Sequence, residues 1–168
     1  MSTETNLLLD ISALADMKGA RVAIIATEWN NDIVASQIEG ARRIAGQTGA
    51  EISSTIYVTG SFELPFACKA LWDNTRETPH QVDAIIAFGA VVRGGTPHFE
   101  YVCKSVTEGI TQLNLTLPVP VIFGVLTVDN ELQAWERLGG AHGHKGEESM
   151  ITALKMIKVA RQLQAMKK

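Results

Sequence analysis

The sequence predicts an α/β fold in which a four-stranded parallel sheet carries helices on both faces, forming a three-layer sandwich. Two patterns predict this class. Short continuous apolar runs, typical of strands that are buried on both faces, recur along the chain. Longer segments with apolar residues at helical spacing separate these runs, so strands and helices alternate as in consecutive βαβ units.

The first half of the chain predicts two strands and two helices. Residues 22–26 form a continuous apolar run, which predicts the first strand. Segment 32–48 has apolar residues at helical spacing and ends before Gly49, a residue type common at helix C-termini. Segment 52–58 is rich in β-branched residues and predicts the second strand, and a second helix is expected over 65–72.

The second half continues the alternation and ends in a long helix. Two strands and three helices are expected: strands 82–92 and 119–126, and helices 98–115, 130–138 and 147–166. Right-handed crossovers between parallel strands leave few topologies, of which a flavodoxin-like sheet is the natural one.

The length of 168 residues suits a single domain, which is expected over residues 17–168. Residues 1–16 form an N-terminal arm that has no partner in the predicted sheet. This arm is expected to be disordered or to pack on another subunit.

Charge and cysteine content exclude several classes of protein. The chain has 15 Lys and Arg against 18 Asp and Glu, a net charge of −3, which argues against a nucleic-acid module and a polybasic membrane surface. Cys68 and Cys103 form no CxxC pair, which excludes a zinc ribbon and favours a reducing compartment. The longest apolar stretches reach about ten residues, short of the ~18 that span a bilayer. A soluble, cytoplasmic protein is expected.

Loops that follow the predicted strands carry the candidate functional residues. In an open parallel sheet, ligands bind at the carboxyl ends of the strands. Three of the four loops combine aromatic with ionisable residues, and the last two of them also contain glycine: 27–31, 59–65 and 93–100. The functional site is therefore expected at this edge of the sheet.

Trp29 and Glu63 each admit two interpretations. Trp29 either offers a stacking face to a planar ligand or covers the edge of the sheet, and its position favours neither. Glu63 precedes Pro65, which is common in the first turn of a helix, so the helix N-terminus keeps the Glu63 carboxylate ionised. Taken alone, Glu63 is better explained as an acid at a helix start than as a ligand-binding residue.

The loop after the third strand predicts a phosphate site with an adjacent acid–base residue. Gly94 and Gly95 let the backbone approach a ligand closely, just before a helix whose free N–H groups bind anions. Thr96 adds a hydroxyl donor, Arg93 adds positive charge, and His98 is suited to proton transfer near neutral pH. This interpretation is preferred to a plain Gly-rich turn. A Walker A loop is excluded, because the GK[ST] ending is absent.

His142 and His144 stand two positions apart in a glycine-containing loop that precedes Lys145. No nearby Cys or Asp completes a plausible ligand set for a metal. The loop is therefore expected to supply cationic or polar groups, without a metal site.

Five motifs resemble those of the 6,7-dimethyl-8-ribityllumazine synthase family. They keep the family's order and spacing from residue 21 onward: Trp29-Asn30, 60–65, 89–102, 120–127, and 133–137 through 143–146. The long third motif is specific. The sequence departs from the family pattern at Trp29, where many members have Phe, and at His144, where Asn is common.

The resemblance implies a transferase that needs neither a metal nor a redox cofactor. The family condenses 5-amino-6-(D-ribitylamino)uracil with 3,4-dihydroxy-2-butanone 4-phosphate, releasing phosphate and water. The product is 6,7-dimethyl-8-ribityllumazine, formed in the penultimate step of riboflavin biosynthesis.

The resemblance also implies which residues bind the pyrimidine and its ribityl chain. Trp29 matches the aromatic residue that stacks on the pyrimidine. The turn of Ser61, Phe62 and Glu63 matches the one that binds the ribityl chain and the ring edge. The strand end of Ala90, Val91 and Val92 matches the one that binds the pyrimidine through its backbone.

A second set of implied residues handles the phosphate and the proton. Gly95 and Thr96 match the phosphate-binding turn, and His98 matches the proposed catalytic proton carrier. Phe123 matches an aromatic residue that reaches the site of a neighbouring subunit, and Arg137 matches the cation that binds the substrate phosphate. Three further residues match accessory positions: Asn30, Lys145 and Glu148.

The resemblance implies a homo-oligomer with the active site between adjacent subunits. Family members form pentamers, some of which assemble into icosahedral shells, and the arm of residues 1–16 would lie along a neighbour's sheet. Segment 137–145 has no long insertion, which favours a shell. Riboflavin synthase is a further partner that the resemblance suggests. Two other classes stay open: a non-catalytic flavin- or pyrimidine-binding module of flavodoxin-like fold, and a purely structural shell protein.

Overall fold

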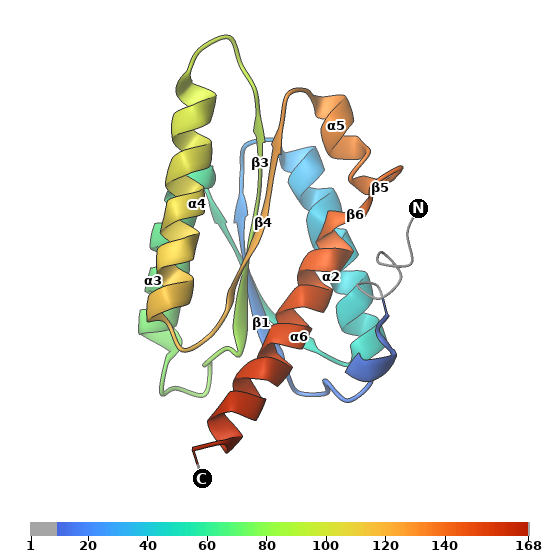
Figure 1. The fold of residues 1–168 in the computed structure, drawn as a ribbon, viewed down its shortest axis with the longest axis vertical. Coiled ribbons are helices and arrows are strands. Elements are labelled where there is room, and N and C mark those ends of the chain that lie inside the picture. The colour runs from blue at the N-terminus through green and yellow to red at the C-terminus, as the bar shows by residue number, and fades with distance from the viewer. Residues whose placement is uncertain (1–9, 168) are drawn as a thin grey trace.

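Four strands form one parallel sheet with helices on both faces, in a computed structural model that describes residues 10–167 (Figure 1). The strand order is β2–β1–β3–β4, and the strands are β1 (Arg21–Thr27), β2 (Glu51–Val58), β3 (Ala84–Val92) and β4 (Val121–Val128). All three pairings are parallel. The predicted three-layer, flavodoxin-like α/β fold is confirmed.

The helices lie in pairs on the two faces of the sheet (Figure 1). On one face lie α2 (Asn31–Thr48) and α6 (Lys145–Ala165), and on the other lie α3 (Leu64–Thr75) and α4 (His98–Thr116). Two single 3₁₀ turns, η1 (Ser12–Leu14) and η2 (Ser61–Glu63), complete this part of the chain. Each of these four helices overlaps the segment that was predicted for it.

The helix expected over 130–138 is wrong in its second half. The structure has a short helix α5 (Glu131–Trp135), followed by a hairpin of β5 (Leu138–Gly140) and β6 (Gly143–His144). Gly139 and Gly143 adopt φ values of +105° and +75°. Both glycines belong to the hairpin, whose left-handed backbone suits glycine, so residues 138–140 form a strand of the hairpin and do not extend the helix.

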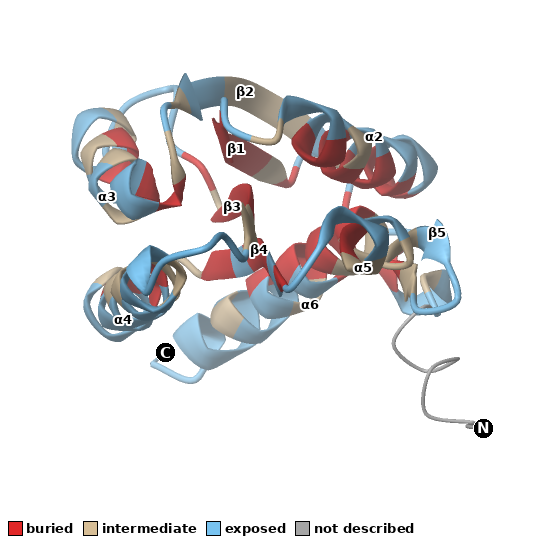
Figure 2. Cartoon of the chain, turned by 90° about the horizontal axis from the view of Figure 1, so that it is seen from above, coloured by how far each residue is buried: buried red, intermediate tan, exposed pale blue. Residues whose placement is uncertain are grey.

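Side chains alternate between two cores, one on each face of the sheet. Ile24 and Ile86 pack with α2 and α6, whereas the adjacent Ile25 and Ile85 pack with α3 and α4. Successive strand residues point to opposite faces, and both faces are covered (Figure 2). The continuous apolar runs of the sequence follow from this arrangement.

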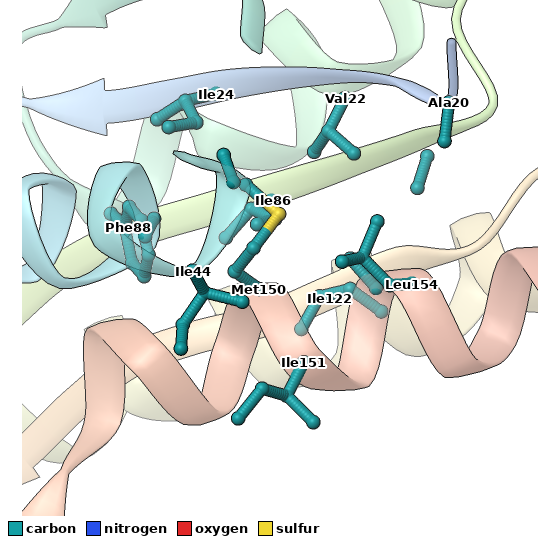
Figure 3. Close-up of a cluster of buried hydrophobic side chains, with 14 of the residues drawn as sticks. Ala20, Val22, Ile24, Ile44, Ile86, Phe88, Ile122, Met150, Ile151 and Leu154 are labelled. Carbon is teal, nitrogen blue, oxygen red and sulfur yellow. The ribbon is translucent and has the colours of Figure 1, made fainter. Parts of the chain in front are cut away.

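The core under α2 and α6 contains the larger cluster of buried side chains (Figure 3). Phe88 from β3 lies there with Met150 and Leu154 from α6, all of them buried. Each such side chain contributes about 1.5–3 kcal/mol to folding through removal of its apolar surface from water. Helix α6 is therefore held firmly against the strands that carry the site.

The N-terminal segment begins to pack on this core before residue 17. Leu14 is only 1% exposed and, with Met17, belongs to the cluster under α2 and α6. Lys158 Nζ of α6 donates a hydrogen bond to Ala13 O at 2.7 Å. The last residues of the expected arm therefore pack on this chain's own core, and residues 1–9 of the arm lie outside the described residues.

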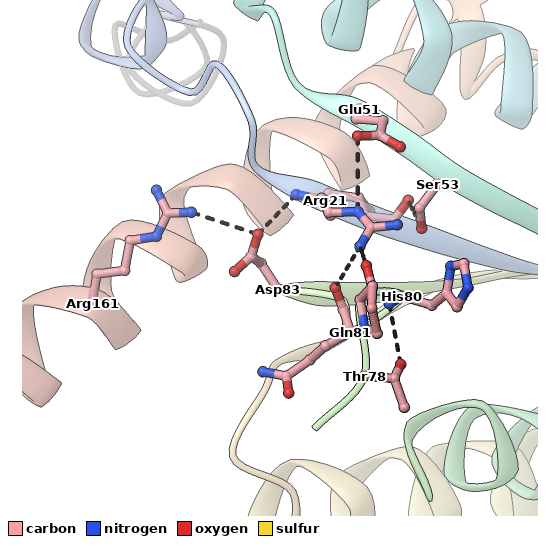
Figure 4. Close-up of polar contacts among 10 residues, drawn as sticks. Arg21, Glu51, Ser53, Thr78, His80, Gln81, Asp83 and Arg161 are labelled. Atoms are coloured by element: carbon pink, nitrogen blue, oxygen red, sulfur yellow. Dashed lines mark hydrogen bonds and ion pairs between the residues drawn. The ribbon is translucent and has the colours of Figure 1, made fainter. Parts of the chain in front are cut away.

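A polar network joins the amino ends of β1 and β3 to α6, at the end of the sheet opposite to the predicted site (Figure 4). The Arg21 N–H donates to Asp83 Oδ2 at 2.8 Å, and Asp83 pairs with Arg161 at 3.5 Å. The Arg21 guanidinium also donates to the carbonyl oxygens of Pro79 and Gln81. These contacts stabilise the fold rather than the site.

Within residues 10–167, no helix has both the length and the apolar character that crossing a bilayer requires.

Candidate active site

The carboxyl ends of β1, β2 and β3 surround a cleft of about 660 Å³, here called the first cleft. Nine predicted site residues line it together with three others: Trp29, Asn30, Ser61, Phe62, Glu63, Ala90, Val91, Val92 and His98, with Thr59, Gly60 and Val102. The order β2–β1–β3 brings their three loops side by side. The predicted edge of the sheet is thus the edge that carries this cleft.

The turn between β1 and α2 forms one wall of the first cleft. The Trp29 N–H donates to Thr59 O at 3.2 Å, and the Thr27 hydroxyl donates to Trp29 O at 3.1 Å. The Trp29 side chain is 69% exposed, so it does not shield the apolar edge of the sheet. The ring is therefore accessible to a planar ligand, and its role in stacking stays a prediction.

Asn30 connects this turn to the end of β3. Its backbone lies in the left-handed region, with φ +56°, which asparagine tolerates better than most residues. Its side-chain Nδ2 donates to Ala90 O at 2.8 Å. Asn30 therefore holds the strand end that lines the cleft.

The turn between β2 and α3 forms an adjoining wall. Glu63 Oε2 accepts a hydrogen bond from the Gly60 N–H at 3.0 Å, so the carboxylate stabilises the turn at the helix start while it also lines the cleft. Ser61 is buried, and a Cβ placed on Gly89 would lie 2.8 Å from Ser61 Oγ. The glycine in β3 thus makes room for the serine of the turn.

Arg93 is paired with two carboxylates at the start of the loop between β3 and α4. Arg93 Nε donates to Asp129 Oδ1 at 2.8 Å, and the guanidinium also pairs with Glu100 and lies 4.1 Å from the centre of the Phe99 ring. These hydrogen bonds hold the pKa of Asp129 and of Glu100 below their usual values and raise the pKa of Arg93. The expectation that Arg93 adds free positive charge at the loop is corrected: its charge is balanced locally, and it joins three segments of the site edge.

Gly95 and Thr96 lie in the exposed turn directly before α4 and line neither the first cleft nor the second cleft described below. A Cβ placed on Gly94 or Gly95 would meet no atom within 4 Å. Packing within the chain therefore does not require these glycines, and an incoming group can approach the backbone there. His98 follows as the first residue of α4 and lines the first cleft.

The remaining predicted residues lie around a second cleft of about 620 Å³, between the edge strand β4 and α6. Phe123, which is 42% exposed, Arg137, Lys145 and Glu148 all line it. Lys145 Nζ donates to Glu148 Oε2 at 2.6 Å, and an Arg137 guanidinium N–H donates to Gln133 O at 2.9 Å. The two clefts share no lining residue among residues 10–167, so the predicted site residues that line a cleft fall into two separate groups, with Gly95 and Thr96 outside both.

The edge of the sheet that carries the site also contains residues that sequence reasoning did not select as site residues. Thr27 fixes the Trp29 turn, and the signal for it was its place directly after the apolar run of β1. Val102 lines the first cleft because it lies four residues after His98, on the same side of α4.

His144 differs from the expected loop residue. It ends β6, is only 9% exposed, and burial lowers its pKa, so the imidazole is neutral near pH 7. It therefore does not supply a cation to the loop.

Within residues 10–167, no three His, Cys, Asp or Glu side chains form a group that could hold a metal ion.

The part of the chain that matches known proteins includes both clefts. The family model of 6,7-dimethyl-8-ribityllumazine synthase matches residues 19–161. The 6,7-dimethyl-8-ribityllumazine synthase of Porphyromonas gingivalis is 49% identical over 141 residues, which cover 83% of this chain and 84% of that protein. Proteins of the same name are 43% identical in Parabacteroides distasonis, over 88% of this chain and 91% of that protein, and 41% identical in Phocaeicola vulgatus, over 92% and 90%. All lining residues of the two clefts fall within the matched range.

Proposed function

This chain belongs to the 6,7-dimethyl-8-ribityllumazine synthase family, and from that premise we infer its reaction. It is a transferase that condenses 5-amino-6-(D-ribitylamino)uracil with 3,4-dihydroxy-2-butanone 4-phosphate to 6,7-dimethyl-8-ribityllumazine, in riboflavin biosynthesis. The observation that carries this conclusion is the family match over residues 19–161, which spans every motif of both clefts. The comparisons give no support to a non-catalytic binding module.

For the first cleft, we propose that it holds the ribitylaminouracil. Trp29 stacks on the pyrimidine, and its exposed ring supports this role. The backbone of Ala90–Val92 binds the ring edge, while the turn of Ser61, Phe62 and Glu63 binds the ribityl chain. The lining of the cleft by all of these residues supports the assignment, as does a volume within the range of small-molecule sites.

For the phosphorylated substrate, we propose a site formed by Gly95, Thr96 and Arg137. The open space around Gly95 and the start of α4 behind it support an anion at this turn. His98, the first residue of that helix, carries the proton between the reacting groups. Lys145 and Glu148 are accessory charges beside Arg137.

A complete site then requires two copies of the chain, and we propose that adjacent subunits of a pentamer or a pentamer-based shell share it. The separation of the first cleft from the second, which contains Phe123 and Arg137, supports this arrangement. Exposed apolar residues on α6 beside the second cleft also support an interface: Met156, Val159 and Leu163.

We propose that the N-terminal arm, in the part that precedes its contacts with this chain's own core, pairs with the outer edge of β2 in a neighbouring copy. In the described sheet, β2 pairs only with β1, and Ile56 and Tyr57 of this strand are exposed.

We also propose a reducing, cytoplasmic setting, because Cys68 and Cys103 are both free thiols.

The experiment that tests the function mixes the purified protein with both substrates and follows the absorbance of the lumazine. We expect formation well above the uncatalysed rate. Calorimetry with the ribitylaminouracil alone runs in parallel. Binding without turnover would support the non-catalytic alternative, and neither binding nor turnover would support a structural shell protein.

Replacing Arg137 with alanine is expected to weaken use of the phosphorylated substrate. A lost charge-assisted contact to phosphate is worth about 1.5–3 kcal/mol, which corresponds to a rise in KM of roughly 10- to 150-fold. Steady-state kinetics with the other substrate saturating measures this. Arg42→Ala, which removes an exposed arginine paired with Glu39 on α2, serves as the control and should leave KM unchanged. An unaltered KM in Arg137→Ala would contradict the assignment.

A further inference from the structure

His144 is enclosed between α2 and the β5–β6 hairpin. A Cβ placed on Gly40 of α2 would lie 2.4 Å from His144 Cε1 and 2.5 Å from Nδ1, so the imidazole occupies the space that a larger residue at position 40 would need. On its other side, His144 pairs with Leu138 across the hairpin, and a Cβ on Gly139 would lie 3.8 Å from Cδ2. The ring therefore packs the hairpin onto the helix.

The segments that flank the hairpin carry the charged groups of the second cleft: Arg137 directly before it, and Lys145 and Glu148 directly after it. The Lys145 N–H donates to Arg137 O at 2.8 Å, which ties the two ends of the hairpin together. Both residues line the second cleft, with Glu148 one turn further along α6. A shift of His144 away from α2 must therefore move the backbone that carries Arg137 and Lys145.

The surroundings favour an imidazole without charge. His144 Nδ1 is buried and has no hydrogen-bond partner, so a proton added there would meet no acceptor. The charged groups nearby are Arg43 on α2 and Glu147 and Glu148 on α6. Arg43 pairs with Glu147 at 2.9 Å and Glu148 pairs with Lys145 at 2.6 Å, so both carboxylates are already engaged.

We propose that His144 is a positioning residue: as a neutral imidazole packed against Gly40, it holds Arg137 and Lys145 in place for the phosphorylated substrate. The proposal rests on the proposed role of Arg137 in phosphate binding. Protonation of the ring replaces a packed neutral group with a buried charge, which loosens the hairpin and weakens phosphate binding. Acid therefore reduces the affinity for this substrate through a residue that does not touch it.

The direction of the pH effect follows from the lowered pKa of His144. The ordinary pKa of histidine is 6.5. Burial, followed by Arg43, lowers the pKa of His144, against the opposing effects of Glu147, of a hydrogen bond to the residue's own backbone, and of Glu148. The unpacked hairpin takes up a proton near pH 6.5, whereas the packed one takes it up only at lower pH. The hairpin is therefore fully packed above about pH 6.5, and packing is lost progressively as the pH falls below that value and through the lowered pKa of His144.

The test compares the pH profile of KM for the phosphorylated substrate in the native protein and in His144→Asn. Asparagine keeps a short, neutral polar side chain that cannot be protonated. The substrate phosphate itself gains a proton near pH 6, and comparison at each pH removes this shared effect. Between pH 7.5 and pH 5.5, we expect KM to rise by roughly 5-fold more in the native protein than in the variant. This is below the roughly tenfold change in affinity that uptake of one linked proton allows per pH unit. Equal profiles would overturn the proposal.

A pair of glycine variants on α2 tests the packing separately from titration. Gly40→Ala forces the imidazole ring away from α2, so KM for the phosphorylated substrate should rise by about 10-fold at pH 7.5. A displacement of about 1 Å in the groups that bind a substrate is enough to reduce activity by a large factor. Gly46→Ala, on the same helix, meets no atom within 4 Å and should leave KM unchanged. Equal KM values in these two variants would also overturn the proposal.

Hydrogen–deuterium exchange supplies a readout that does not depend on turnover. Peptides covering residues 136–149 should lose protection in the native protein between pH 7.5 and pH 5.5, after correction for intrinsic exchange rates, and should keep it in His144→Asn. If no lumazine forms but this difference is observed, the proposed function fails while the packing role of His144 stands. If lumazine forms and the difference is absent, the role of His144 fails alone.

Discussion

Replacing Gly146 with alanine is expected to lower the free energy of unfolding by about 3 kcal/mol, the upper range for overpacking a core. Gly146 lies in the first turn of α6, where a Cβ would stand 2.1 Å from Gln37 O and 2.8 Å from the Gln37 carbonyl carbon. These are backbone atoms of α2, so no side-chain rotation relieves the clash. Urea denaturation at fixed protein concentration measures the effect.

The clash also disturbs a contact that reaches the edge strand. Gln37 is buried, and its Nε2 donates to Gly124 O of β4 at 2.6 Å, next to Phe123 in the second cleft. Moving α2 breaks or strains this hydrogen bond. Gly46→Ala is the matched control, since it adds the same methyl group to a helix in open space and should be neutral or stabilising by up to ~1 kcal/mol. Equal urea midpoints for the two variants would contradict the close packing of α2 on α6.

Replacing His98 with alanine is expected to lower kcat by about 100-fold, the lower range for loss of a general acid–base group. KM for the ribitylaminouracil should stay close to its native value, because Trp29 and the end of β3 remain in place. Stopped-flow absorbance of the lumazine gives the rate. His80→Ala removes a histidine side chain at the opposite end of the sheet, near Arg21, and should not change kcat (Figure 4). An unchanged kcat in His98→Ala would remove His98 from the mechanism.

Co-expression of His98→Ala with Arg137→Ala in one cell tests whether two copies share the site. Each variant retains the group that the other lacks, and the two groups lie in different clefts of the chain. In a random ring, about one quarter of the shared sites combine an intact His98 with an intact Arg137. Activity near that fraction of native is therefore expected, and activity no higher than the two single variants would contradict a shared site.

The regular elements could be predicted because burial on both faces leaves an unambiguous pattern. The apolar runs in β1 and β3 have almost no polar interruption, and they occupy the two central positions of the sheet. The hairpin of β5 and β6 could not be predicted, because its short strands have no alternation to read. Its path depends on left-handed glycines at 139 and 143.

The candidate residues of the first cleft could be predicted because parallel strands bring their following loops to one edge. Interactions between distant segments were not visible. The pairing of Arg93 with Asp129 and Glu100 depends on how β3, β4 and α4 meet, and the contact of His144 with Gly40 joins segments about a hundred residues apart.

The sequence by itself determined the fold class, the edge of the sheet that carries the site, and the family to which the chain belongs, since each is written in local runs and motifs. Only the tertiary structure decided that most of the predicted residues divide between two clefts, that the charge of Arg93 is balanced, and that His144 is buried and neutral. The physical reason is that charge compensation, desolvation and cleft geometry arise between segments that only folding brings together.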